Sequence, residues 1–263
     1  MPRNGLLNLY SNQKRKLCLN KQTNKQTNKQ TNKQTNKQTK GYVINLNRSP
    51  ERLRKFFSQT SANLFTRMPA VDKKLLELFD LEIFFNTSLC ESLIGRKVTS
   101  GEIACTLSHI ACWKAIANDD TLLDRDFAII AEDDVLLKND LQSSLQDVIV
   151  TFENGYFLNQ DNVDLIILQS LAFDWFNLDE NFCPMYYEFD NSGSSLFLIR
   201  KSLAIELTEK LKKEKPYWLA DWFTDFCDKE RVRGVKPHLG YIVGGFDAPS
   251  DLESDRQRAR CNT

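Results

Sequence analysis

The stretch that most constrains the fold of this chain is FAIIAEDDV, residues 127–135. The residues before Glu132 are apolar without interruption, which is typical of a strand buried on both faces of a parallel sheet. Glu132, Asp133 and Asp134 then follow in a row, and adjacent carboxylates repel one another unless a cation or solvent faces them. Ligands usually bind at the carboxyl ends of strands in an open α/β sheet. We therefore expect Glu132 and Asp134 to hold a divalent metal; a strand that runs into a solvated acidic turn is the alternative.

Strand-like and helix-like segments alternate along the chain, and this alternation favours an α/β fold with a parallel, doubly wound sheet. The 263 residues suffice for one domain with a sizeable core. The clearest apolar runs predict strands at 41–47, 127–132, 164–169 and 195–199. Apolar residues at helical spacing predict helices at 50–57, 99–117, 141–152 and 200–213.

Five other segments have weaker patterns. Met68–Asp72 resembles a short strand that ends in a polar loop, Lys73–Phe85 is compatible with a helix, and Thr87–Lys97 has the composition of a loop. Pro216–Phe223 is predicted to open a helix, because proline suits the first helical position. Val235–Gly245 is predicted to form a last strand and loop.

The first 40 residues differ in composition from the rest. They contain ten Lys and Arg residues and no acid, whereas residues 41–263 carry 25 basic and 35 acidic side chains. From Asn20 to Thr39 the unit Asn-Lys-Gln-Thr occurs five times without an apolar residue, so this segment cannot offset the entropy of ordering. We expect a disordered basic tail at 1–40, a globular domain at 41–251 and a charged tail at 252–263. The acidic balance of the globular part disfavours a nucleic-acid partner.

The repeat also suggests a property of the gene. Lys-Gln-Thr-Asn can be encoded by AAACAAACAAAC, a four-base unit read three times, and a perfect four-base repeat slips in replication and shifts the reading frame. We hypothesise that expression of the protein is phase-variable. In the protein itself, the spaced lysines predict a solvated linker, with peripheral contact at an anionic inner-membrane surface as the alternative.

Cysteine usage and hydropathy predict the compartment. The seven cysteines are odd in number and form no regular framework, which favours a reducing environment. No apolar run approaches the roughly 20 residues that span a bilayer, and Leu6–Tyr10 is too short and polar for a signal-peptide core. We therefore expect a soluble cytoplasmic protein.

Two stretches carry residues that suit nucleotide binding. Asn45, Asn47 and Arg48 stand where the first strand turns into the first helix, which Ser49 and Pro50 are expected to begin. Such a turn commonly holds a nucleotide in α/β folds. An ordinary surface cation is the alternative for Arg48.

The helix at 99–117 begins with a capping box, in which Thr99 caps and Glu102 reaches back. Cys105, His109 and Cys112 share one face of this helix, but no fourth zinc ligand is evident. We interpret His109 as a histidine of the core or cleft, and the cysteines as ordinary buried residues.

Carboxylates among aromatics suggest a further functional region. Residues 171–190 mix aromatics with acids, including Asp174 and Asp190, and this composition suits either packing or stacking on sugar rings. Asp221 stands among apolar aromatics and is a candidate general base. An Asp that caps a helix or pairs with a lysine is the alternative.

Several segments in order and spacing together resemble glycosyltransferase family 25, the bacterial lipooligosaccharide glycosyltransferases. They cover nearly all of 41–251. Ala104 stands where the family often has glycine, and Leu196-Phe197 replaces its usual Gly-Tyr, which bears on the acceptor more than on the donor. The matching segments are Tyr42–Ser49 with Arg52, Pro69–Asp72, Gly101–His109 with Trp113, Ile130–Val135, and Asp221-Trp222.

The resemblance implies a Rossmann-like, A-type glycosyltransferase fold with a catalytic domain at 41–251. It also implies a UDP-sugar donor, inversion at the anomeric carbon, and transfer of galactose from UDP-galactose to a lipooligosaccharide core sugar. Mn²⁺ or Mg²⁺ held by Glu132 and Asp134 would stabilise the departing diphosphate. A metal-dependent nucleotidyltransferase and a non-catalytic nucleotide-sugar-binding protein are the alternatives from other classes.

The resemblance implies roles for the donor-side residues. Asn45 and Arg48 would contact uridine or the diphosphate. Glu102 and His109 would line the donor cleft, although Glu102 could serve only as a cap. Asp133 would face the donor sugar at the catalytic centre.

An inverting single displacement needs one carboxylate to deprotonate the acceptor hydroxyl. Asp221 is the expected catalytic base. Asp174 and Asp190 are the alternatives.

Overall fold

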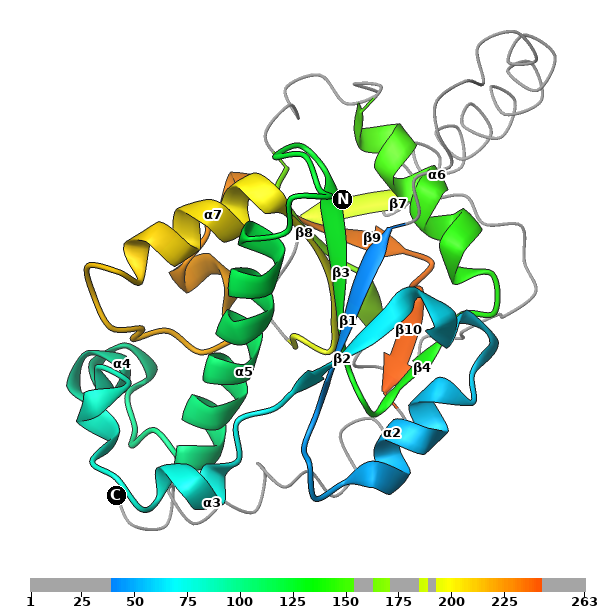
Figure 1. The fold of residues 1–263 in the computed structure, drawn as a ribbon. Helices are drawn as coiled ribbons and strands as arrows, with labels where there is room; N and C mark the ends of the chain where they lie inside the picture. The colour runs from blue at the N-terminus through cyan, green and yellow to red at the C-terminus, as the bar shows by residue number, and fades with distance from the viewer. Residues whose placement is uncertain (1–38, 154–162, 171–184, 189–192, 243–263) are drawn as a thin grey trace, which may run out of the picture.

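The computed structural model describes residues 39–153, 163–170, 185–188 and 193–242, which build one central sheet flanked by helices (Figure 1). Strands β2, β1, β3, β5 and β9 run in one direction, while β8 and β7 run against it. The α/β class with a mostly parallel sheet is confirmed; β8, however, is antiparallel between β3 and β5. The strands, in spatial order, are β2 (Phe65–Pro69), β1 (Lys40–Asn45), β3 (Phe127–Glu132), β8 (Leu196–Arg200), β5 (Leu165–Ile167), β9 (Val232–Lys236) and β7 (Met185–Glu188).

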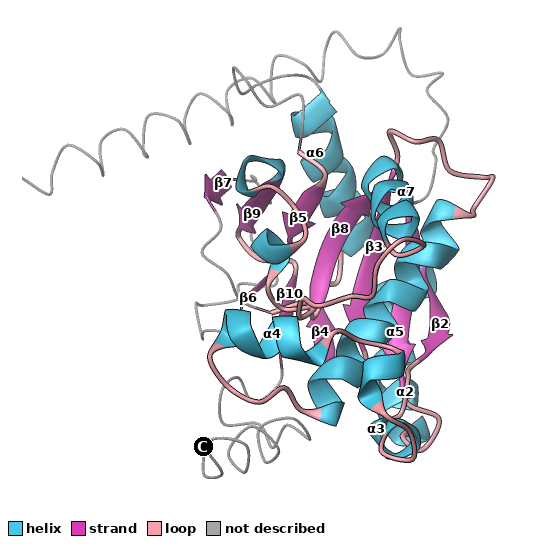
Figure 2. Ribbon diagram, turned by 90° about the vertical axis from the view of Figure 1, so that its left-hand side faces the viewer, coloured by secondary structure: helices cyan, strands magenta, loops and turns pink. Residues whose placement is uncertain are grey.

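Helices cover both faces of the sheet (Figure 2). One face packs against α5 (Ser100–Ala117) and α7 (Lys201–Lys210). The other face packs against α2 (Pro50–Phe57) and α6 (Leu141–Glu153). All four helices lie where the apolar spacing predicted them, although α7 ends three residues earlier.

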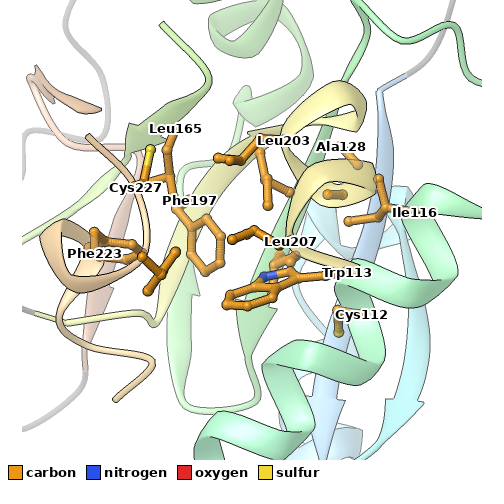
Figure 3. Close-up of a cluster of buried hydrophobic side chains, with 14 of the residues drawn as sticks. Cys112, Trp113, Ile116, Ala128, Leu165, Phe197, Leu203, Leu207, Phe223 and Cys227 are labelled. Atoms are coloured by element: carbon orange, nitrogen blue, oxygen red, sulfur yellow. The ribbon is translucent and has the colours of Figure 1, made fainter. Parts of the chain in front are cut away.

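Strand β3 contributes to both cores, as its uninterrupted apolar sequence predicted. Ala128 and Ile130 belong to the core under α5 and α7, and Ile129 belongs to the core on the opposite face. All three side chains are fully buried. Trp113 of α5 and Phe197 of β8 are among the large side chains that fill the first core, which Figure 3 shows in close-up.

A second sheet begins immediately after the acidic residues. Its three strands, in spatial order, are β4 (Val135–Leu137), β10 (Gly240–Ile242) and β6 (Gln169–Ser170). The strand expected at 164–169 is therefore divided between β5 and β6. The last strand, expected within 235–245, is likewise divided between β9 and β10.

The segment Thr87–Lys97, expected to be a loop, contains helix α4 (Thr87–Ile94). The Asn86 side chain caps this helix by accepting a hydrogen bond from the Leu89 N–H at 3.1 Å. Gly95 ends it in the left-handed conformation at φ 69°. Both end signals are local, and Cys90 on the buried face anchors the helix against α5.

The helix expected to open at Pro216 does not form. The Pro216 carbonyl accepts a hydrogen bond from Asn86 N–H, and the Ala220 N–H donates to Thr106 Oγ1. These backbone groups are therefore satisfied by distant parts of the chain rather than by helical bonds, and only a 3-10 turn follows at Phe223–Asp225.

Smaller differences concern the segment between β1 and α5. The expected strand at Met68–Asp72 starts three residues earlier, as β2. The helix-compatible segment 73–85 holds only α3 (Lys73–Leu76) and a 3-10 turn at Leu81–Ile83. Its short span is explained by Asp72 and Asp80, whose side chains cap two separate turns.

The domain limits remain predictions. β1 begins at Lys40, the last residue of the expected tail, and Thr39 is buried. Residues 1–38 and 243–263 lie outside the described part of the chain. Within that part, no helix combines the length and hydropathy needed to cross a bilayer.

Gly41 in β1 lies where a side chain does not fit. A Cβ there would lie 2.8 Å from the Leu64 carbonyl oxygen and 2.9 Å from Phe65 Cδ1. Gly41→Ala is expected to lower the free energy of unfolding by about 1–3 kcal/mol, because a backbone carbonyl cannot move aside cheaply. Denaturant unfolding measures this change, and Gly95→Ala is the comparison: nothing lies within 4 Å there, so only the left-handed backbone costs about 1–2 kcal/mol. Wild-type stability of Gly41→Ala would contradict the steric argument.

Candidate active site

The carboxyl end of β3 brings together polar side chains from several elements. Glu132 is the last residue of β3, and its neighbour in register on β1 is Ile44, directly before Asn45. The Glu132 N–H donates to the Ser195 carbonyl, so the segment that enters β8 lies on the other side. Strand order alone therefore places Asn45 and Ser194 on either side of the acidic residues.

Glu132 faces helix α5. Its Oε1 lies 3.4 Å from His109 Nε2 and accepts a hydrogen bond from Ser194 Oγ at 3.1 Å. Burial by itself would raise the pKa of Glu132, but the contacts with His109, Ser194 and the Arg52 charge outweigh it and lower the pKa. The His109 ring is buried and stacks on Phe197 at 5.6 Å between centroids. Glu132 is thus held as a carboxylate.

Asp221 joins this cluster through Ser194. Its Oδ1 accepts from Ser194 Oγ at 2.8 Å and from the Ser194 N–H at 3.1 Å. Because a hydroxyl has one hydrogen, Ser194 can donate to only one of Glu132 and Asp221 at a time. The arrangement places two carboxylates within hydrogen-bond distance of a single hydroxyl. Ser194 had not been identified from the sequence, since nothing in the local pattern distinguishes it.

Asp133 and Asp134 face the other way, toward Arg52 of α2. Arg52 Nη2 donates to Asp134 Oδ2 at 2.9 Å and also forms an ion pair with Asp133 Oδ1. Burial raises the pKa of both aspartates; with the nearby charge of Glu132, it raises that of Asp134 to about 6. Among the described residues, Arg52 Nε and Asp134 Oδ1 are buried without a hydrogen-bond partner. A donor and an acceptor at this site are therefore left for a ligand.

Asn45 organises the site from within. Its Nδ2 donates to Asp133 Oδ2 at 2.6 Å and to the Ser49 carbonyl at 3.0 Å, while its Oδ1 accepts from Arg67 Nε. Only 2% of Asn45 is exposed. The buried Asn45 side chain therefore orients Asp133. The same contact fixes the start of α2, where Ser49 occupies the N-cap without a side-chain capping bond.

Two residues expected to face the donor have protein partners instead. Arg48 Nε pairs with Asp72 at 2.8 Å. Glu102 completes the predicted capping box with Thr99 and accepts two hydrogen bonds from Arg96, at 2.9 and 2.6 Å. These contacts join neither residue to Glu132 or Asp134. Glu102 is thus a helix-capping residue, as the alternative expectation stated.

A second group of potential metal ligands overlaps the first. Ligand atoms of Cys105, His109 and Glu132 all lie within 4.8 Å of one another. Cys112, which shares their helix, belongs to the apolar core instead, and burial raises the pKa of its thiol (Figure 3). Cys105 and His109 of this face of α5 thus lie near Glu132 of β3. Asp174 and Asp190, the alternative bases, lie outside the described residues.

The ion pairs of Arg52 make a stability prediction. The Arg52 charge opposes the rise in the pKa of Asp133 and Asp134, so Arg52→Gln raises both values further. When folding raises the pKa of an acid, the folded protein loses stability as the pH rises through that pKa. We expect Arg52→Gln to be about 1–2 kcal/mol less stable than wild type at pH 7. This value allows for solvent screening, because the Arg52 side chain is partly exposed.

Denaturant unfolding across pH tests this expectation. The deficit should shrink toward pH 4 and below, where the carboxyls are protonated in both states. Lys55→Gln, at an exposed position on the same helix, is the matched control. A deficit that does not change with pH would show that packing rather than charge explains it.

Part of this site lies within the range of the chain that matches a known family. The sequence profile of glycosyltransferase family 25 (LPS biosynthesis protein) matches residues 38–193, more than half of the chain. The matched range includes Asn45, Arg52 and the acidic residues, and it ends directly before Ser194.

Two similar proteins are each called "Glycosyltransferase 25 family member". One, from Aedes aegypti, is 31% identical over 102 residues, and the other, from Anopheles gambiae, is 32% identical over 100 residues. Each alignment covers 36% of this chain and 16% of the relative. The shared part is therefore a small fraction of those longer proteins.

Proposed function

Since the chain belongs to glycosyltransferase family 25, we propose that it is an inverting hexosyltransferase that moves galactose from UDP-galactose onto a lipooligosaccharide core sugar. One observation carries the proposal. At the carboxyl end of β3, two groups of acids face different neighbours: Asp133 and Asp134 face a cation, and Glu132 and Asp221 share a hydroxyl. Sugar transfer needs charge stabilisation for the departing diphosphate and a carboxylate that takes the acceptor proton, and acids of both groups are available for these roles.

Glu132 and Asp134 would hold the divalent metal. Two features fit this role: both are oxygen ligands, which Mg²⁺ and Mn²⁺ prefer, and Asp134 Oδ1 has no partner among the described residues. A bound divalent cation supplies charge stabilisation to the departing diphosphate. Arg52, which already pairs with Asp134, offers a buried Nε–H in the same place for a phosphate oxygen.

The group of Cys105, His109 and Glu132 is a second ligand set that shares Glu132. Thiolate and imidazole favour zinc, whereas two carboxylates favour magnesium or manganese. Calorimetric titration of Cys105→Ser and Asp134→Asn with Mn²⁺ and Zn²⁺ separates the two sets. Loss of Mn²⁺ binding only in Asp134→Asn supports the carboxylate pair; loss only in Cys105→Ser assigns the metal to α5.

Asp221 would take the proton from the acceptor hydroxyl. Ser194 holds one of its oxygens through both N–H and Oγ, which orients the carboxylate at the edge of the site. Asp133, oriented by Asn45, would contact the donor sugar. His109 would set the position of Glu132 in the donor cleft, and Arg48 would reach the donor only after leaving Asp72.

A screen of UDP-hexoses with the purified protein tests the proposed function. We expect UDP release that depends on Mn²⁺ or Mg²⁺, fastest with UDP-galactose, and transfer of galactose to truncated lipooligosaccharides. Transfer of a nucleotide instead of a sugar would indicate a nucleotidyltransferase. Donor binding without turnover for any hexose would indicate a binding protein.

The gene repeat and the arrangement of the tails belong to the same proposal. We propose a basic tail at 1–40, a catalytic domain at 41–251 and a charged tail at 252–263. We also propose that the enzyme is cytoplasmic and that its expression is phase-variable. Sequencing the repeat tests the last point, because slippage requires identical codons for Lys, Gln and Thr in every unit.

A further inference from the structure

A hollow of 430 Å³ opens beside α5. Its floor is apolar and comes from three parts of the chain, namely the 3-10 turn at 81–83, α5 and the segment after α7. The apolar lining residues are Ile83, Phe84, Leu107, Ile110, Leu211 and Pro216.

The remaining lining residues are strongly basic. Lys114, Lys212, Lys213 and Lys215 line the hollow against a single acid, Glu214. All four lysines are exposed. Within the described residues, Lys114 and Lys213 form no ion pair, whereas Lys212 pairs with Glu209. The hollow therefore combines apolar surface with a net positive charge.

Exposed apolar side chains also occur along the segment from α3 to α4, which includes Ile83 of the hollow. Leu78 and Phe79 are 74% and 56% exposed, which is unusual for side chains of this size in a water-soluble surface. Figure 1 and Figure 2 both place α3 and α4 next to α5. The exposed apolar residues of this segment are Leu75, Leu78, Phe79, Ile83, Leu89 and Leu93.

The acids of the same segment are engaged within the protein. Glu77 accepts a hydrogen bond from Ser100, Glu82 accepts from Thr87, and Glu91 pairs with Lys97. Asp80 caps the turn that follows it. Of these partners only Lys97 is a cation, so Glu77, Asp80 and Glu82 keep their negative charge. The excess of positive charge is therefore confined to the hollow, where four lysines stand against Glu214.

We propose that this surface, formed by α3, α4 and the lysine-lined hollow, docks onto an anionic lipid bilayer. Exposed apolar side chains near lysines match the two requirements of interfacial binding, insertion of apolar area and attraction to anionic headgroups. A protein partner fits less well, because protein interfaces are depleted in lysine.

The surface lies close to the proposed active site. α3 follows directly from the end of β2, and the Val71 N–H at its start donates to Ser108 Oγ, next to His109 on α5. A lipid-linked acceptor would therefore lie near the carboxyl edge of the sheet when the protein is docked. Only this benefit to catalysis rests on the proposed function; the lipid binding does not.

Vesicle co-sedimentation of the full-length protein tests the surface. We expect binding to vesicles of phosphatidylcholine with phosphatidylglycerol, and little binding to phosphatidylcholine alone. Replacing Lys212, Lys213 and Lys215 together by Gln should weaken the partition on the order of 100-fold. Leu78→Gln with Phe79→Gln should weaken it roughly tenfold. Leu123→Gln with Lys229→Gln, two exposed positions elsewhere, is the matched control and should bind as wild type does.

Three results of the vesicle assay would overturn the docking surface. They are absence of binding by the wild type, equal binding to neutral and anionic vesicles, and undiminished binding by the triple Gln variant, which would assign the attraction to other lysines such as those of the tail. A dimer in solution that Leu78→Gln with Phe79→Gln disrupts would assign the surface to a second copy instead. UDP-hexose turnover without lipid is measured separately, so a failure of the proposed activity is distinguishable from a failure to bind vesicles.

Discussion

Asp134→Asn is expected to reduce sugar transfer by about 10³-fold or more while the protein stays folded. The substitution keeps the size of the side chain and its contact with Arg52 but removes the charge that a divalent cation needs. Mn²⁺ titration should show the same loss directly, independently of turnover. Retained transfer with UDP-galactose and manganese would exclude Asp134 as a metal ligand.

The same substitution, which should lower activity, is expected to raise stability. Folding raises the pKa of Asp134 to about 6, mainly through burial and then through the charge of Glu132. The stability associated with the protonated form is therefore present below about pH 4 and is lost as the pH rises through 6. Asn cannot ionise, so Asp134→Asn should be more stable than wild type at pH 7, by about 1 kcal/mol after allowance for the 39% exposed side chain.

Thermal unfolding at pH 4 and at pH 7 measures this difference. Wild type and Asp134→Asn should coincide at the lower pH and separate at the higher one. Asp120→Asn, at an exposed position in the loop before β3, is the matched control and should show no gain. A variant that is less stable at pH 7 would mean that the Arg52 contact outweighs the cost of burying the charge. A gain in stability together with a loss of transfer would mark Asp134 as a residue kept for function.

The parts of the fold that sequence predicted are those with local causes. The burial of β3 on both faces follows from its uninterrupted apolar sequence, and the start of α5 follows from the Thr99 and Glu102 capping box. Helix α4 also has local signals, since Asn86 before it and Gly95 after it are ordinary helix-end residues. A search for paired end signals would have found it despite its weak apolar spacing.

The parts that sequence did not predict depend on distant contacts. Ser194 joins Glu132 to Asp221 only because β8 lies beside β3, and the antiparallel placement of β8 is not readable from its own residues. Arg52 stood within the segments that resemble the family, but its pairing with Asp133 and Asp134 requires α2 to pack near the end of β3. Partners of this kind become visible only when strand order is known.

Asp221→Asn is expected to lower turnover by about 10²–10⁴-fold while the affinity for the UDP-sugar donor stays unchanged. Asn can still accept the hydrogen bonds from Ser194 N–H and Oγ, so the geometry of the edge is kept while the proton acceptor is lost. Asp225→Asn is the matched control: it lies in the 3-10 turn that follows Asp221 and burial raises its pKa, but its site is separate from the Ser194 contact.

Ser194→Ala separates the role of the base from that of its support. Without the hydroxyl, Asp221 keeps the N–H of residue 194 as a donor but loses its link to Glu132, so turnover should fall less than in Asp221→Asn. Donor affinity measured by calorimetry and turnover measured by UDP release distinguish the outcomes. Loss of donor binding in Asp221→Asn would remove Asp221 from the base role and place it in the donor site, next to Glu132. Wild-type turnover in Asp221→Asn would leave deprotonation of the acceptor to another carboxylate, because an inverting transfer still requires one.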